Sequence, residues 1–230
     1  MIPATHNEIE QIYLAAESNH SRSICVTACH SGDGVTSIAS ALTERLLLAG
    51  YSTLLVDFNL FKSGFEPYSL IDTPIDSEVQ WLHPVNSERL FTGIAKPQQT
   101  SAIVNYRNPQ FLATKIQSWL QHFDRVVIDT SPLLQINRGN IPAQSVASAC
   151  DHTLIVVLGG HTTETQLDKA NELLLRSNAN IIGVILNNML QATLGQEIVR
   201  EINRFKFIPK RLRDKWSRVI LNNEWLANIA

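Results

Sequence analysis

The run Ser23-Ile-Cys-Val-Thr-Ala-Cys-His-Ser-Gly-Asp-Gly-Val-Thr-Ser37 decides the fold of this chain. Its apolar part, Ile24 to Ala28, is typical of a buried strand, and an amphipathic helix pattern follows from Ile38 to Ala49. Glycines between a strand and a helix let successive backbone N–H groups turn inward and hold an anion at the helix N-terminus. The run therefore predicts the frame of a phosphate-binding loop, made by Gly32, Asp33, Gly34, Val35, Thr36 and Ser37.

The residue after the last glycine departs from this pattern. Working phosphate-binding loops carry a lysine there, which reaches the β- and γ-phosphates, but here the residue is Val35. A hydrogen bond to a charged group contributes about 1.5–3 kcal/mol, so its loss weakens nucleotide binding by roughly tenfold to over a hundredfold. Because the same charge stabilises the transition state of phosphoryl transfer, we expect catalysis to suffer more than binding.

Further apolar runs predict additional buried strands that alternate with helical stretches. This order favours a doubly wound, mostly parallel α/β sheet with helices on both faces, the P-loop NTPase type. Polar residues at the carboxyl ends of such strands mark the ligand crevice, and Asp57, Asp129 and Asn187 hold that position here. The runs are Leu54–Asn59, Arg125–Pro132, Asp151–Leu158 and Ile181–Asn187.

With these blocks, the chain resembles the bacterial tyrosine kinases (BY-kinases) of capsule and exopolysaccharide systems, within the MinD/ParA group of deviant-Walker P-loop ATPases. The resemblance extends from about Glu8 to Asn187. It implies that Thr36 and Asp129 hold Mg²⁺, that Asp57 takes the general-base position, and that Asn187 contacts the purine of a nucleotide. Purely structural roles remain open for these residues, such as helix capping by Thr36, and we favour a structural role for Asp57.

Departures from the family pattern all point toward lost catalysis. The family's two loop lysines fall on Val35 and His30, and its second acidic residue in the middle block falls on Asn59. We interpret His30 as an exposed loop histidine. We therefore expect Asp57 and Asp129 to be inherited catalytic positions that are inactive, with no firmly bound cofactor; weak binding of ATP or ADP with Mg²⁺ stays open.

The family's assembly and substrate segments are missing as well. Its ring-forming Glu-x-x-Arg-x-x-Arg helix corresponds to Glu8–Leu14, where Gln11 and Leu14 replace the arginines, so we expect a monomer or dimer. The family's tyrosine-rich tail is also absent, because the tyrosines of the chain are Tyr13, Tyr51, Tyr68 and Tyr106.

Composition is that of an ordinary globular domain. The chain has 230 residues, 44% hydrophobic and 17% charged, which predicts a single domain over residues 1–230 with a helix at about 6–18. A net charge of −2 argues against nucleic-acid binding, and three cysteines without metal spacing predict buried thiols. No run has transmembrane length or signal-peptide form, so we expect a cytoplasmic protein. The irregular stretch from Phe61 to Asn108 predicts loops and one edge strand near Arg89–Thr92.

A basic amphipathic helix is predicted at about residues 208–221. Leu212, Trp216, Val219 and Ile220 fall on one helical face, and basic residues surround them. We favour packing of this helix on its own domain, which would bury Trp216. Peripheral contact with the inner face of the inner membrane is the alternative.

These observations favour a degenerate BY-kinase-like accessory protein. The resemblance implies that its partner is the cytoplasmic tail of a polysaccharide co-polymerase-type membrane protein, the family's chain-length determinant. Two alternatives stay open: an active tyrosine autokinase or ATPase that uses a lysine from elsewhere, and a MinD/ParA-type positioning ATPase.

Overall fold

The computed structural model describes residues 2–60, 68–71, 80–84, 91–95, 97, 99–135, 139–188, 194–205 and 209–223. Contacts within the chain define two compact units. The first contains Met1–Val157 and Thr162–Leu186, and the second contains Leu158–His161 and Asn187–Ala230. The single-domain organisation predicted from the sequence stays a prediction.

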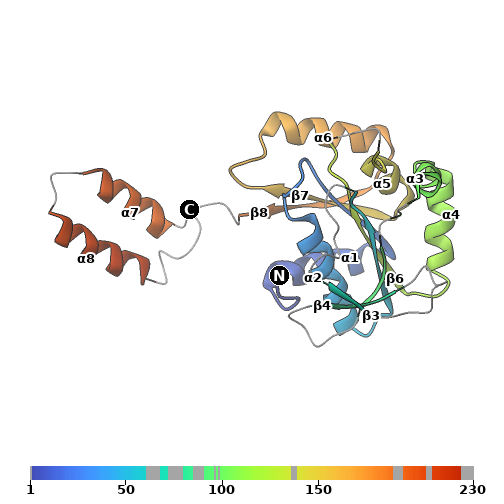
Figure 1. Cartoon of the computed structure of the whole chain (residues 1–230), viewed down its shortest axis with the longest axis horizontal. Coiled ribbons are helices and arrows are strands. Elements are labelled where there is room, and N and C mark those ends of the chain that lie inside the picture. The colour runs from blue at the N-terminus through green and yellow to red at the C-terminus, as the bar shows by residue number, and fades with distance from the viewer. Residues whose placement is uncertain are drawn as a thin grey trace. The chain divides into compact units, whose positions relative to one another are not determined.

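An eight-stranded sheet with the order β3-β4-β5-β2-β6-β1-β7-β8 forms the centre of the fold (Figure 1). The pairs β5–β2, β2–β6, β6–β1 and β1–β7 are parallel, and β4 is antiparallel to β3 and β5. Between β7 and β8, the Thr153 N–H donates to the Asn180 carbonyl and the Gly159 N–H donates to the Asn187 carbonyl. Residue numbers rise along both strands in the same direction, as they do in a parallel pair. The doubly wound, mostly parallel α/β class predicted from the sequence is therefore confirmed. The strands are β1 (Ser23–Ala28), β2 (Thr53–Phe58), β3 (Tyr68–Ile71), β4 (Gln80–Pro84), β5 (Phe91–Ile94), β6 (Arg125–Thr130), β7 (His152–Leu158) and β8 (Ile181–Asn187).

Helices cover both faces of this sheet, with an apolar core under each layer (Figure 1). Side chains of a strand alternate between the two cores: Val126 and Ile128 of β6 join one, and Val127 joins the other. One core lies under α3 (Thr100–Tyr106), α4 (Pro109–Trp119), α5 (Ala143–Ala149) and α6 (Glu164–Arg176), and the other under α1 (Asn7–Ser18) and α2 (Val35–Leu48).

Two strand predictions need correction. The run Ile181–Asn187 was expected to be buried, but Val184 is 54% and Leu186 60% exposed because β8 is the last strand of the sheet. The strand near Arg89–Thr92 was expected at an edge, but β5 pairs on both sides, with β4 and with β2. Arg89 itself lies outside the described residues.

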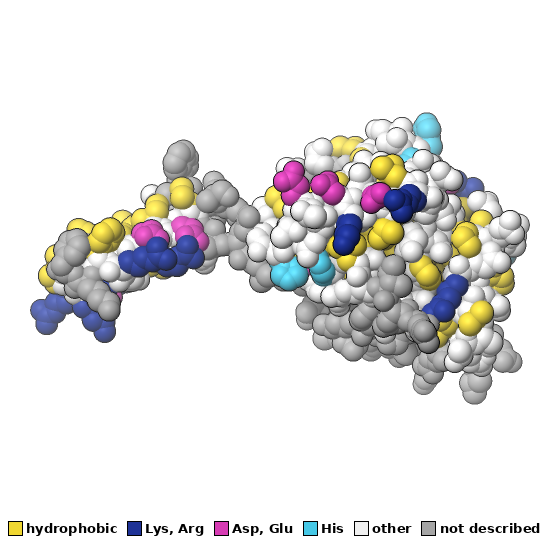
Figure 2. All heavy atoms as spheres, turned by 90° about the horizontal axis from the view of Figure 1, so that it is seen from above, with side chains coloured by type: hydrophobic (Ala, Val, Ile, Leu, Met, Phe, Trp, Pro, Cys, Tyr) yellow, Lys and Arg dark blue, Asp and Glu magenta, His cyan; other side chains and the backbone are white. Residues whose placement is uncertain are grey.

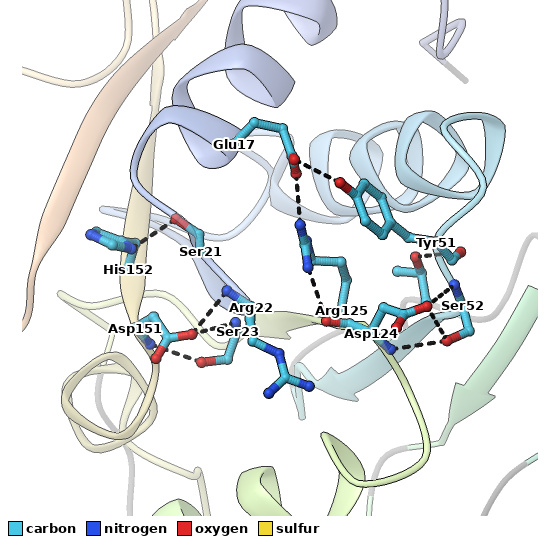
Figure 3. Close-up of polar contacts among 11 residues, drawn as sticks. Glu17, Ser21, Arg22, Ser23, Tyr51, Ser52, Asp124, Arg125, Asp151 and His152 are labelled. Carbon is cyan, nitrogen blue, oxygen red and sulfur yellow. Dashed lines mark hydrogen bonds and ion pairs between the residues drawn. The ribbon is translucent and has the colours of Figure 1, made fainter.

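A polar network ties the amino ends of the strands to α1 (Figure 3). Glu17 accepts hydrogen bonds from the Tyr51 hydroxyl at 2.7 Å and from Arg125 Nη2 at 3.0 Å, and the Arg125 guanidinium lies 4.0 Å from the centre of the Tyr51 ring. Asp151 Oδ2 accepts the main-chain N–H groups of Arg22 and Ser23. These charges hold secondary-structure elements together at the end of the sheet opposite the glycine loop, so we assign them a structural role.

The three cysteines are free and buried, as predicted. Burial raises the pKa of Cys25 to about 12 and that of Cys29 to about 11. Thiols with such pKa values are protonated at neutral pH and chemically inert.

The second unit contains a helical hairpin of α7 (Leu194–Arg204) and α8 (Lys210–Leu221), which pack against each other (Figure 1). Arg213 Nη1 of α8 donates to the carbonyl of Asn203 at 3.1 Å. Apolar side chains line one side of the hairpin and lysines and arginines another (Figure 2). Within this unit by itself, Trp216 is 44% exposed and no residue of α8 is buried, because two helices alone cannot enclose a side chain of this size. The packing of α8 on the first unit, which would bury Trp216, stays a prediction. Among the described residues, no helix is long and apolar enough to cross a membrane.

Candidate functional site

The glycine loop connects the end of β1 to the start of α2. Gly32 and Gly34 have φ angles of +95° and +106°, a region that residues with a Cβ rarely adopt, so glycine is required at both turns. Two main-chain N–H groups of this loop already have protein acceptors. The His30 N–H donates to Asp33 Oδ2 at 2.9 Å, and the Ser31 N–H donates to Gln135 Oε1 at 3.0 Å.

Val35 is the first residue of α2, and its side chain belongs to the apolar core beneath α1 and α2. It is 7% exposed. The position that carries the phosphate lysine in working loops is therefore a core position here. The loop has the predicted backbone frame, but at this position it presents no charge.

Thr36 and Asp129, the predicted metal position, lie side by side. The Thr36 hydroxyl donates to Asp129 Oδ2 at 2.5 Å, and Asp129 is 2% exposed. Its other carboxylate oxygen, Oδ1, has no hydrogen-bond partner among the described residues. Burial, and secondarily the charge of Asp57, raises the pKa of Asp129 well above its usual range, and the hydrogen bond from Thr36 opposes that shift. A buried carboxylate oxygen beside a hydroxyl is chemically suited to a hard cation such as Mg²⁺.

Asp57 and Asp129 are direct neighbours in the register of β2 and β6, so the sheet brings both predicted carboxylates together. Asp57 is fully buried, and its Oδ1 accepts the Asn59 N–H at 2.9 Å. This bond turns the chain as it leaves β2, which agrees with the structural role favoured for Asp57. Ser37 lies half-buried in the first turn of α2, and Asn187 ends β8 in the second unit, where its purine contact stays a prediction.

His30 differs from its sequence prediction. An exposed loop side chain was expected, but the imidazole is only 14% exposed and its Nδ1 lies 3.8 Å from Asp33 Oδ2. The carboxylate of Asp33 is fully buried in the turn of the loop. The His30 side chain lies against this buried carboxylate, which shields the imidazole from solvent.

Two site residues escaped the sequence-based prediction. Gln135 follows β6 and accepts a hydrogen bond from Ser31 of the loop, 104 positions away in the sequence, so no local pattern marks it. Ser131 links the ends of β2 and β6, because its hydroxyl donates to the Phe58 carbonyl at 3.1 Å and accepts the Leu60 N–H at 3.3 Å. The sequence Asp129-Thr130-Ser131 at the end of β6 was visible, but the contacts of Ser131 depend on the order of the strands in the sheet.

A magnesium nucleotide fits this site only in part. Thr36 and Asp129 suit the metal ion, and the glycine turns suit a phosphate. The buried carboxylate of Asp33 and the apolar Val35 do not suit the negative charge of a triphosphate. The arrangement can hold a cation more readily than it can stabilise phosphoryl transfer.

Among characterised proteins, the relatives are tyrosine kinases. The chain is 27% identical over 188 residues to the tyrosine-protein kinase CpsD of Streptococcus agalactiae, covering 75% of this chain and 78% of that protein. It is 22% identical over 190 residues to the putative tyrosine-protein kinase CapB of Staphylococcus aureus, covering 77% and 80%. No family model matches the chain.

Solved structures share the fold at low sequence identity. The kinase domain of the Escherichia coli tyrosine kinase ETK superposes with a TM-score of 0.61 and 17% identity, covering 78% of this chain and 72% of that one. MinD of Pyrococcus horikoshii, complexed with Mg-ADP, superposes with a TM-score of 0.54 and 18% identity, covering 85% of this chain and 76% of that one. The relatives in sequence and the neighbours in fold agree with the motifs of the loop and the strand ends. The chain is similar in sequence to bacterial tyrosine kinases, and it shares its fold with the kinase domain of ETK and with MinD.

Proposed function

We propose that this chain is a catalytically impaired BY-kinase-like protein that serves capsule or exopolysaccharide biosynthesis and export by binding a partner. The partner is the cytoplasmic tail of a polysaccharide co-polymerase-type membrane protein, which places the chain in the cytoplasm at the inner face of the inner membrane. The observation that carries the proposal is the burial of Val35 in the apolar core, at the position of the phosphate lysine.

The electrostatics of the loop support impaired catalysis. Phosphoryl transfer needs fixed positive charge where negative charge develops. Here the loop contains a buried carboxylate, Asp33, and the main-chain N–H groups of His30 and Ser31 are bound to protein oxygens. When Mg²⁺ is bound with a weakly held ATP or ADP, Thr36 and Asp129 would hold it, and it would neutralise phosphate charge. Asp57 and Asp129 remain inherited positions of a catalytic site that lacks the positive charge of the phosphate lysine.

The tyrosines whose side chains the structure describes, Tyr13, Tyr51 and Tyr106, have structural surroundings. Tyr106 is 6% exposed and its ring centre lies 4.8 Å from that of Phe58. The Tyr51 hydroxyl donates to Glu17, and the Arg45 guanidinium lies 3.9 Å from the ring centre of Tyr13. Such contacts are unlike those of a tyrosine-rich tail that reaches an active site, which supports a protein that does not phosphorylate itself.

The contacts of α1 support a monomer or dimer. The acidic residue of the ring motif corresponds to Glu8, whose Oε2 lies 2.5 Å from Nδ1 of His6 in its own chain. Gln11 and Leu14 hold the positions of the ring arginines and carry no charge.

Calorimetry tests this proposal directly. The full chain is titrated with a synthetic peptide of the cytoplasmic tail of the co-polymerase encoded nearest to it, with and without Mg-ATP. Saturable binding that does not depend on nucleotide supports an accessory role. Absence of binding in both conditions would contradict it. A scrambled peptide of equal composition is the matched control.

The helical hairpin favours a second candidate, a MinD/ParA-type protein with peripheral membrane contact. Leu212, Trp216 and Val219 are 44%, 44% and 64% exposed on α8, beside Arg211, Lys215 and Arg218. Exposed apolar residues with flanking basic residues are typical of a helix that lies in a membrane interface. Co-sedimentation with phosphatidylserine vesicles, but not with phosphatidylcholine vesicles, that is lost in Trp216→Glu would favour this candidate.

A further inference from the structure

A cavity of about 550 Å³ lies beside the glycine loop, and we call it the α6 cleft. One wall is α6, through Gln166, Lys169, Glu172 and Leu173. The other is the segment after β6, through Leu133 and Leu134, and His30 of the loop also lines the cleft. The Thr36–Asp129 pair is not part of this lining, so the cleft is distinct from the predicted metal position.

The walls of the cleft are fixed by hydrogen bonds. The Leu133 N–H donates to the Ala28 carbonyl at 2.8 Å, and the Leu134 N–H donates to the Cys29 carbonyl at 3.1 Å. On the other side, the Cys29 thiol donates to the Gln166 carbonyl at 3.7 Å. The end of β1 therefore anchors both walls, and the cleft is formed before any ligand arrives, which reduces the cost of binding.

The charges of the cleft leave one cation without a counter-ion. Glu172 accepts from Arg176 Nη2 at 2.6 Å, so its charge is already balanced on the same helix. Lys169 makes no ion pair among the described residues, and its side chain is exposed to solvent. Three leucines stand next to this lysine in the lining of the same cavity. A hollow in which three leucines lie beside one ammonium group, with no ion pair to that group among the described residues, suits a ligand that combines an apolar side chain with a carboxylate.

We propose that the α6 cleft binds a short peptide segment that carries Leu or Phe next to Asp or Glu, with its carboxylate paired to Lys169. The proposal deepens the proposed function, on which it rests, because it gives the chemistry of the partner segment and the surface that receives it. The segment after β6 also holds the loop through the bond from Ser31 to Gln135. A peptide bound on Leu133 and Leu134 therefore lies on the segment that keeps the loop in its present form.

The test uses the full chain and two synthetic peptides. The acidic probe is acetyl-Ser-Leu-Glu-Phe-Asp-Ser-amide, and the neutral probe has Gln and Asn in place of Glu and Asp. Binding is followed by the methyl NMR signals of the leucines and by calorimetry. We expect the acidic probe to shift the signals of Leu133, Leu134 and Leu173. Because a solvent-exposed ion pair contributes about 0.2–1 kcal/mol, the neutral probe should bind up to about fivefold more weakly.

Substitutions separate charge from packing. Lys169→Met should bind the acidic probe only as weakly as the wild type binds the neutral probe, and Lys169→Arg should bind the acidic probe like the wild type. Leu173→Asp should abolish binding of both probes, and an unchanged melting temperature would show that the fold is kept. Lys115→Met on α4, which removes a lysine outside the cleft lining, is the matched control and should bind like the wild type.

Several outcomes would overturn the inference, and one would overturn the proposed function instead. Equal affinity for both probes, wild-type binding by Lys169→Met, or leucine signals that do not move at millimolar probe would each refute it. Weaker Mg-ADP binding by Lys169→Met with unchanged peptide binding would assign the lysine to a nucleotide instead. If the partner tail binds Lys169→Met as it binds the wild type, the cleft is refuted while the proposed function stands. If the acidic probe binds and the tail does not, the proposed function is refuted while the cleft stands.

Discussion

Replacement of Val35 by lysine would return the missing charge to a site that the fold uses for packing. Burial of a valine side chain contributes about 1.5–3 kcal/mol, and a cation in the first turn of a helix costs about 0.3–1 kcal/mol. The aliphatic stem of lysine recovers part of the apolar contact. We therefore expect Val35→Lys to lower the free energy of unfolding by about 2–3 kcal/mol, or about 4–12 °C in melting temperature at about 2–4 °C per kcal/mol for a chain of this size.

The same substitution should strengthen nucleotide binding. A hydrogen bond to a charged group contributes about 1.5–3 kcal/mol, so the Kd of Mg-ADP should fall roughly ten- to a hundredfold. Val35→Met, which has a similar stem and no charge, separates the charge from the packing change. Calorimetry with Mg-ADP and a melting curve for each variant are the measurements. Equal Kd values for the lysine and methionine variants, both folded, would refute the assignment of this loop as a phosphate-binding frame weakened by the loss of its lysine.

Three further predictions follow from single side chains. Because the folded-state pKa of Asp129 is raised, its ionised form destabilises the folded protein above the ordinary value of 3.8; Asp129→Asn should raise the melting temperature at pH 7, and the gain should shrink as the pH falls toward 3.8 and vanish below it. A melting temperature that drops at pH 7 would contradict this. If α8 packs on the first unit, as the sequence predicts, Trp216→Ala should lower the free energy of unfolding by about 3–5 kcal/mol in a denaturant titration, and a change of less than about 1 kcal/mol would contradict that packing. Mass spectrometry of the chain expressed with its membrane partner should find no stoichiometric phosphotyrosine, and such a modification on any of the four tyrosines would refute the reading as an impaired kinase.

Much of the fold could be predicted because its signals are local. The apolar run before Gly32 and the amphipathic pattern after it mark β1 and α2 directly. The bounds of α6 also have local signals, because Thr163 and Gln166 form a reciprocal capping box and Ser177 is the C-cap residue. The status of β8 was not predictable, since an apolar run looks the same in the centre and at the edge of a sheet.

The site was predictable in its inherited parts and not in its tertiary contacts. Asp57 and Asp129 were identified as strand-end carboxylates, and the register of β2 and β6 makes them neighbours. The sequence identifies the missing charge at Val35, but only the packing shows that its side chain is part of the core. The bond from Ser31 to Gln135 joins segments far apart in the sequence, so no spacing rule reveals it.

Steady-state turnover of Mg-ATP by the purified wild-type chain, beside Asp129→Ala, tests the central claim of impaired catalysis most directly. Asp129 is the buried carboxylate on which any magnesium-dependent chemistry at this loop would depend. The burial of Val35 predicts that both proteins release phosphate at the same background rate, with or without the partner tail. Turnover by the wild type that Asp129→Ala abolishes would contradict the account and identify an active kinase or ATPase with an unusual loop.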